Sequence, residues 1–228
     1  MRRLRVGLLA GIAVLSLAAC ERQKAARSAP SPSKLAADAA DVGLLAAAEP
    51  FEALTDAAFT TKLAELDPGI ATAVATAEHV KPALPPDAQK ELQTHLDAIA
   101  AARREGNRAG IALDSVEVYR VLVSHAPPDV VPREVNLLRY AGHRYAVDLK
   151  GAPASWDDAA EAAAFGQHAW AAIQGRVADA SLRDRMSKAL SDMAEAVRRR
   201  DAALAADAYQ RELGLADLVE TDLATVRR

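Results

Sequence analysis

Apolar residues recur at intervals of three and four along most of this chain, the spacing that places side chains on one face of an α-helix. Leu92, Leu96 and Ile99 follow one another in this way. Alternation at every second residue, which is typical of a half-buried strand, is rare, and runs of β-branched residues are scarce. We therefore predict an all-α protein built as a multi-helix bundle.

Prolines, glycines and capping residues divide the helical part into about eight helices, preceded by a weaker segment from Leu35 to Ala48. Asp67-Pro68 is typical of an N-cap followed by a first-turn proline, and Ser181 to Asp184 resembles a capping box with Asp in the last position. The predicted helices cover Thr55 to Leu66, Asp67 to Pro82, Asp87 to Gly106, Arg108 to Ser124, a central helix from Val135 to Leu149, Ser155 to Gly175, Ser181 to Arg200, and Asp201 towards Arg228.

Two pairs of segments resemble each other. Ala71 to His79 aligns with Ala160 to His168, and Leu96 to Ala102 aligns with Leu190 to Ala196. One interpretation is a duplication that produced two three-helix units joined by the central helix, with a ligand site between the units. The other is that alanine-rich helical hairpins match through composition alone. Both interpretations are consistent with the sequence.

The N-terminus has the order of features of an export signal. Arg2, Arg3 and Arg5 form a basic start, an apolar stretch of about 14 residues follows, and Leu17-Ala18-Ala19-Cys20 ends it. The stretch is shorter than the roughly 20 residues of a membrane-spanning helix. The last four residues resemble the lipobox of bacterial lipoproteins, in which a small residue precedes a cysteine that is diacylated on sulfur before cleavage.

This resemblance to bacterial lipoproteins implies a signal peptide over residues 1–19 and a mature chain that begins at the lipidated Cys20. Residues 20–33 are rich in proline, serine and charged residues, which is typical of a flexible tether, and 34–228 form the predicted helical domain. Glu21 follows the cysteine, where Asp favours the inner membrane in enteric bacteria. We therefore expect the protein in the bacterial cell envelope, held in the outer membrane by its lipid and facing the periplasm.

Charge narrows the range of partners. The chain has 28 Lys and Arg against 31 Asp and Glu, and residues 1–19 hold three of the arginines and no acid, so the mature chain carries a net charge of −6. Domains that bind nucleic acid are usually strongly basic, so no nucleic-acid partner is expected. Cys20 is the only cysteine, and its lipidation leaves no thiol for a disulfide or a thiolate metal site. The expected partners are the membrane, through the lipid, and a protein of the envelope.

Histidines and methionines are the residues that could hold a metal or haem. The chain has no Glu-x-x-His, no His-Glu-x-x-His and no Cys-x-x-Cys-His. We therefore predict no cofactor, with a metal or haem site at His95, His143 and His168 as the alternative. Met186 and Met193 lie one heptad apart, a spacing that favours core packing over haem ligation.

The segment from Arg139 to Tyr145 concentrates cations, phenols and an imidazole around Gly142 in the central helix. Arg139, Tyr140, His143 and Arg144 are the candidate ligand-binding residues, because arginine and tyrosine suit carboxylate or phosphate groups. The helical wheel places Arg139 and His143 away from the buried face, and Gly142 at a helix contact. The simpler interpretation is a structural helix whose Tyr145 packs inward.

Sequence signatures of catalysis are missing. The chain has no Gly-x-Ser-x-Gly and no phosphate-binding glycine-rich loop, and its one Ser-x-x-Lys, from Ser31 to Lys34, lies at the predicted tether. We therefore predict a binding or interaction module without enzymatic activity. The alternatives are the metal- or haem-binding bundle described above and a structural component of an envelope complex.

Overall fold

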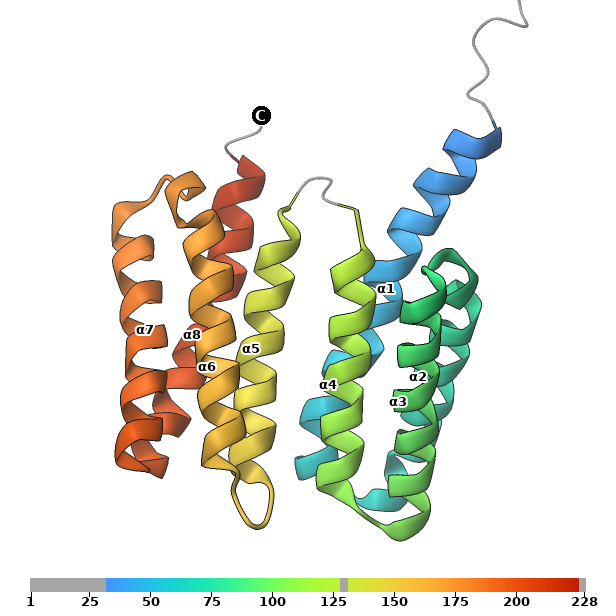
Figure 1. Ribbon diagram of the computed structural model, residues 1–228, viewed down its shortest axis with the longest axis horizontal. Coiled ribbons are helices and arrows are strands. Elements are labelled where there is room, and N and C mark those ends of the chain that lie inside the picture. The colour runs from blue at the N-terminus through green and yellow to red at the C-terminus, as the bar shows by residue number, and fades with distance from the viewer. Residues whose placement is uncertain (1–31, 128–130, 226–228) are drawn as a thin grey trace, which may run out of the picture. The chain divides into compact units, whose positions relative to one another are not determined.

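The computed structural model describes residues 32–127 and 131–225, with side chains from residue 43 onward. Every regular element in these residues is helical, which confirms the all-α multi-helix bundle (Figure 1). The eight α-helices are α1 (Pro32–Thr60), α2 (Asp67–Val80), α3 (Pro86–Glu105), α4 (Arg108–His125), α5 (Arg133–Lys150), α6 (Trp156–Ile173), α7 (Ala180–Arg199) and α8 (Ala202–Thr225). Three short 3-10 helices are η2 (Leu63–Glu65), η3 (Lys81–Ala83) and η4 (Gln174–Arg176).

Residues 39–228 form one compact unit, here called the helical body. None of its described helices combines the length and the apolar character that crossing a membrane requires. The predicted signal peptide 1–19, the lipidation site Cys20 and nearly all of the predicted tether 20–33 lie outside the described residues. Helix α1 begins at Pro32, so it includes the last two residues assigned to the tether.

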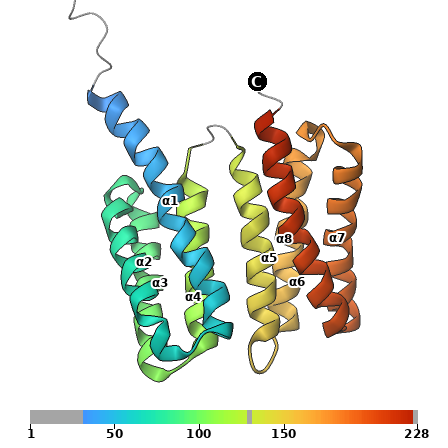
Figure 2. The ribbon, with the colours of Figure 1, turned by 180° about the vertical axis from the view of Figure 1, so that it is seen from behind.

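The helical body contains two groups of four helices, α1 to α4 and α5 to α8, each around its own core (Figures 1 and 2). The core of the second group is formed by α5 to α8, with Tyr145, Met186 and Met193 fully buried in it. Tyr140 and Val147 of α5 belong instead to the cores of the first group. Helix α5 therefore belongs to the second group and also packs against the first.

The two groups correct the predicted repeat. The aligned segments lie in α2 and α6 and in α3 and α7, and each group adds a helix before and after this pair. The units are thus of four helices rather than three. The central helix α5 is the first helix of the second group and not a separate connector, because its own side chains complete that group's core.

Helix α1 is longer than the sequence indicated. Separate segments at 35–48 and 55–66 were predicted, whereas one helix runs through Pro50 to Thr60. A proline in a helix interior costs about 3 kcal/mol. Burial of Phe51 and Leu54 on one stripe beyond the proline offsets this cost, since burying a Phe or Leu side chain contributes about 1.5–3 kcal/mol.

Two predicted caps are also wrong. Asp67 does not cap α2, because its carboxylate accepts hydrogen bonds from Arg103 of α3, at 2.8 Å from Nη2. Ser181 does not open α7, since the N-cap is Asp179, whose Oδ1 accepts hydrogen bonds from the backbone N–H groups of Ser181 (2.8 Å) and Leu182 (3.2 Å). At α2 the aspartate thus binds a side chain of another helix instead of its own helix terminus. At α7 an aspartate two residues before the predicted serine caps the helix.

Candidate functional site

Helix α5 holds all four candidate ligand-binding residues at the boundary between the two helix groups. It contacts α4 on one side and α6 and α8 on the other. The four side chains do not converge on one site. Tyr140 and Arg144 reach α4, whereas Arg139 reaches α8 and His143 reaches α1.

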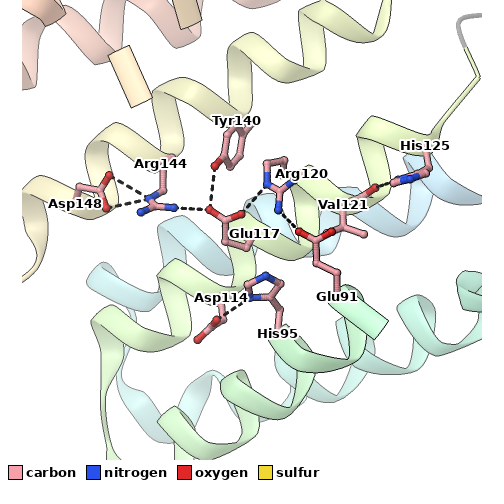
Figure 3. A network of polar contacts seen from close by, with 10 residues as sticks. All are labelled: Glu91, His95, Asp114, Glu117, Arg120, Val121, His125, Tyr140, Arg144 and Asp148. Carbon is pink, nitrogen blue, oxygen red and sulfur yellow. Dashed lines mark hydrogen bonds and ion pairs between the residues drawn. The ribbon is translucent and has the colours of Figure 1, made fainter. Parts of the chain in front are cut away.

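The first set forms a buried network around Glu117 of α4 (Figure 3). Oε1 of Glu117 accepts hydrogen bonds from the Tyr140 hydroxyl (2.9 Å) and from Nη1 of Arg144 (2.5 Å). Oε2 accepts one from Nε of Arg120 at 2.7 Å. Nε of Arg144 also donates to Asp148, at 3.0 Å from Oδ1. Carboxylates and cations are therefore paired across α4 and α5.

Burial alone would raise the pKa of Glu117, but hydrogen bonds from Arg120 and Tyr140 and the charge of Arg144 hold it below its usual value. Burial does raise the pKa of Asp148, to about 6, despite its pairing with Arg144. Arg120 also pairs with Glu91 of α3. Each arginine of the network thus already faces two carboxylates, and this arrangement holds helices together rather than offering a site for an anion.

Arg139 lies on a different face of α5. Its guanidinium donates to Asp217 of α8 (2.8 Å from Nη2), to Glu220 of α8, and to Asn136 one turn earlier (3.2 Å). Burial would lower the pKa of Arg139, but the two carboxylates raise it. The guanidinium is therefore charged and bonded on several edges at once.

His143 was predicted to point away from the buried face, and this is wrong: only 5% of its surface is exposed. Helix α1 covers it, with Nε2 3.1 Å from Oε1 of Glu52 and Nδ1 3.5 Å from Oδ1 of Asp56. Burial by itself would lower the pKa of His143, but the carboxylates of Asp56 and Glu52 raise it to about 9. The imidazole is therefore a buried cation at neutral pH.

Glu212 of α8 is the most unusual buried group among the described residues. It is fully buried, and neither carboxylate oxygen has a hydrogen-bond partner among them. It packs against Gly142 of α5, where a Cβ would overlap Oε2 of Glu212 and lie 2.7 Å from Cδ2 of Leu213. Burial raises the pKa of Glu212 to about 8, so the group is protonated at neutral pH. The short distances from Gly142 to Glu212 and Leu213 confirm the prediction that this glycine lies at a helix contact.

Figure 2 shows α1 and α8 on the near side of the helical body, with α4 and α5 between them. Residues of these four helices line a cleft. Its volume is about 730 Å³. The side chains that line it include Leu45 and Glu49 of α1, Tyr119 and Val123 of α4, Asn136 and Arg139 of α5, and Asp217 and Glu220 of α8. We call it the α5 cleft. Of the four candidate residues only Arg139 lines it, and His143 lies directly behind its Glu52.

The histidines proposed as alternative metal ligands are not brought together. Nδ1 of His95 lies 3.0 Å from Oδ1 of Asp114, His143 is held by α1, and His168 is exposed on α6. Within residues 43–127 and 131–225 no group of three or more His, Cys, Asp or Glu side chains has the geometry to hold a metal. Met186 and Met193 are core residues, as their heptad spacing indicated.

Comparison of the chain with family models, with curated proteins and with solved structures finds no match. The geometry of the α5 cleft and of its charged side chains is therefore the basis for a functional interpretation.

Proposed function

We propose that this protein is a bacterial envelope lipoprotein whose helical body binds a ligand in the α5 cleft without transforming it. The main support for this proposal is the cleft. A volume of about 730 Å³ lies within the range of small-molecule sites, about 300–1,000 Å³, which combine apolar walls with a few placed polar groups. Leu45 and Val123 provide such a wall and Arg139 such a polar group.

The chemistry of the lining favours binding over catalysis. The described residues that line the cleft include no Ser, Cys, His or Lys. Carboxylates can also act as general bases, but Asp217 and Glu220 are bound to Arg139, and Glu52 is bound to His143. Arg139 is bonded to Asp217 and Glu220, and His143 behind the cleft is paired with Glu52, so these cations are fixed in place. Such fixed charges can hold a ligand in one orientation, and this supports a binding role.

Blocking the cleft tests this function. Ala46 is exposed and lines the cleft, so Ala46→Trp fills it without removing a charge. Ala53 is exposed on the same helix two turns later and does not line the cleft, so Ala53→Trp is the matched control. We expect small molecules that mass spectrometry detects after denaturing the wild-type protein, purified from its envelope, to be released by Ala53→Trp and to be absent from Ala46→Trp. Equal release from both variants would contradict a site in the cleft.

The proposed place of action is the periplasmic face of the outer membrane, and it rests on the sequence around Cys20. We expect Cys20→Ser to lose incorporation of a clickable fatty acid, because the thiol is the acceptor of the diacyl group. Two or more acyl chains are needed for stable anchoring, so the serine variant also leaves the membrane fraction or accumulates as unprocessed precursor. Continued labelling of the serine variant would rule out lipidation at this cysteine.

A further inference from the structure

Most of the charge that lines the α5 cleft is negative. The charged lining residues come from three helices and are Glu49, Glu52, Arg139, Asp217 and Glu220. One more cation, His143, lies behind Glu52. Four carboxylates thus face two cations, and an excess of negative charge remains in a cleft with partly apolar walls. Apolar walls focus the electric field of the carboxylates, and this field attracts positively charged solutes.

Glu49 is the carboxylate least engaged with the protein. It is exposed on α1, and no ion pair joins it to any described residue. Glu220, from the opposite wall, shares Arg139 with Asp217. A positively charged ligand between α1 and α8 is therefore attracted by Glu49 from one side and by the acids of α8 from the other.

Tyr119 adds a polar group to the cleft. Only 3% of its surface is exposed, it lines the cleft, and its hydroxyl lies beside the guanidinium of Arg139. Burial raises the pKa of this hydroxyl, and the charges of Glu52 and Glu220 raise it further. The charge of Arg139 lowers this pKa in part. The hydroxyl therefore lies among the charged groups of the cleft, where its oxygen can accept a hydrogen bond from an N–H donor.

The remaining wall is apolar. Leu45 is 38% exposed, one of three large hydrophobic side chains that are exposed among the described residues, and Ala46 and Val123 extend the same surface. A ligand that carried only charge would leave this apolar surface exposed to water. A ligand with a hydrocarbon part covers the surface, and its binding free energy becomes more favourable by about 25 cal/mol per Å² of apolar area buried.

We propose that the α5 cleft binds a small organic cation, an amine whose ammonium group faces Glu49, Tyr119 and Glu220 and whose hydrocarbon part covers Leu45 and Val123. This inference rests on the proposed binding function and specifies its ligand class. It also replaces the anion expected from Arg139 and its neighbours, because each of those arginines is already bonded to two carboxylates.

Three probes of similar size and different charge test the ligand class. Phenethylamine, hydrocinnamate and phenethyl alcohol share a phenyl ring on a short chain and end in an ammonium, a carboxylate and a hydroxyl. They are titrated by calorimetry into the full chain in phosphatidylcholine nanodiscs, with empty nanodiscs as the blank. We expect the amine to bind at least about tenfold more tightly than the other two, and its affinity to fall with added salt.

Variants locate the binding. Glu49→Gln and Tyr119→Phe each weaken binding of the amine by about fivefold or more, since each removes one acceptor for the ammonium. Tyr119→Phe keeps the ring and its packing in the core, so this variant stays folded, which a thermal melt checks. Glu105→Gln, at an exposed carboxylate at the end of α3, leaves the affinity unchanged, and Ala46→Trp abolishes binding.

The outcomes separate the two proposals. Tighter binding of hydrocinnamate, or amine binding that Glu49→Gln and Glu105→Gln weaken equally, overturns the cation and leaves the binding function standing. No binding of any probe, while Ala46→Trp still loses the compounds released from the wild type, also overturns only the ligand class. No binding of any probe together with equal release from Ala46→Trp and Ala53→Trp overturns the binding function itself.

Discussion

Gly142→Leu destabilises the helical body by about 3 kcal/mol, at the upper end of the cost of overpacking a core. A side chain at this position has no room, because the first carbon already overlaps Oε2 of Glu212 and approaches Leu213. Both belong to α8, so the substitution forces α5 and α8 apart. Denaturant unfolding followed by circular dichroism measures the change in the free energy of unfolding.

The chain offers a matched control for Gly142 in the facing helix. Gly214 of α8 is also a helix-interior glycine, but a Cβ there meets no atom within 4 Å. Gly214→Ala should therefore stabilise the protein by up to about 1 kcal/mol through helix propensity, whereas Gly142→Ala should destabilise it. If both alanine variants gain stability, α5 and α8 do not touch at Gly142.

Stability should fall as pH rises from about 5 to 8, and Glu212→Gln should remove much of this fall. The pKa of Glu212 is about 8 in the folded protein, above its usual value of 4.5. A raised folded-state pKa means that the stabilisation is complete below 4.5 and is lost as pH rises to 8. At about 1.4 kcal/mol per pH unit, the loss between pH 5 and 8 is up to about 4 kcal/mol.

Glutamine keeps the shape of the protonated acid and cannot ionise, so the variant's stability relative to wild type should increase with pH. Thermal melts of wild type, Glu212→Gln and the exposed control Glu105→Gln at several pH values measure this slope. His143 and Asp148 add to the fall in the wild type, since their pKa values are raised to about 9 and about 6. A variant slope equal to that of Glu105→Gln would show that Glu212 is ionised in the folded state.

Local signals predicted most of the helices. Gly106 adopts the left-handed conformation, with φ of 73°, that ends α3, and the side chain of Asn107 accepts a hydrogen bond from the Gly110 N–H to open α4. These signals act within a few residues and are readable from sequence. The continuation of α1 through Pro50 is not, because it depends on burial of Phe51 and its neighbours against other helices.

His143 shows the limit of a helical wheel. The wheel orders residues around one helix but does not say how many sides of that helix are covered. Helix α5 is packed by α4, α6 and α8, and α1 reaches His143 through Glu52. A residue opposite the apolar stripe is thus buried as well. His143→Ala is therefore expected to destabilise the helical body, since the variant leaves Glu52 and Asp56 without their cation.

Glu212 was overlooked, although the sequence carried a signal for it. It occupies the apolar stripe of α8, four residues after Ala208, and three and seven residues before Leu215 and Val219. An acid at such a position is worth marking, since buried charges are rare without partners. The α5 cleft carried no comparable signal. Its lining comes from four helices and from Pro127 and Val131 between α4 and α5, and Glu49 and Glu220 are brought to the same cleft only by the tertiary fold.

A crystal structure of the protein purified from its own envelope, without added ligand or with phenethylamine, tests most directly whether the α5 cleft is a binding site. We expect electron density for a compound between Glu49 of α1 and Glu220 of α8, with a nitrogen atom within hydrogen-bond distance of a carboxylate and carbon atoms against Leu45. A bound compound located elsewhere, or a cleft closed by contact between α1 and α8, would contradict the proposed function.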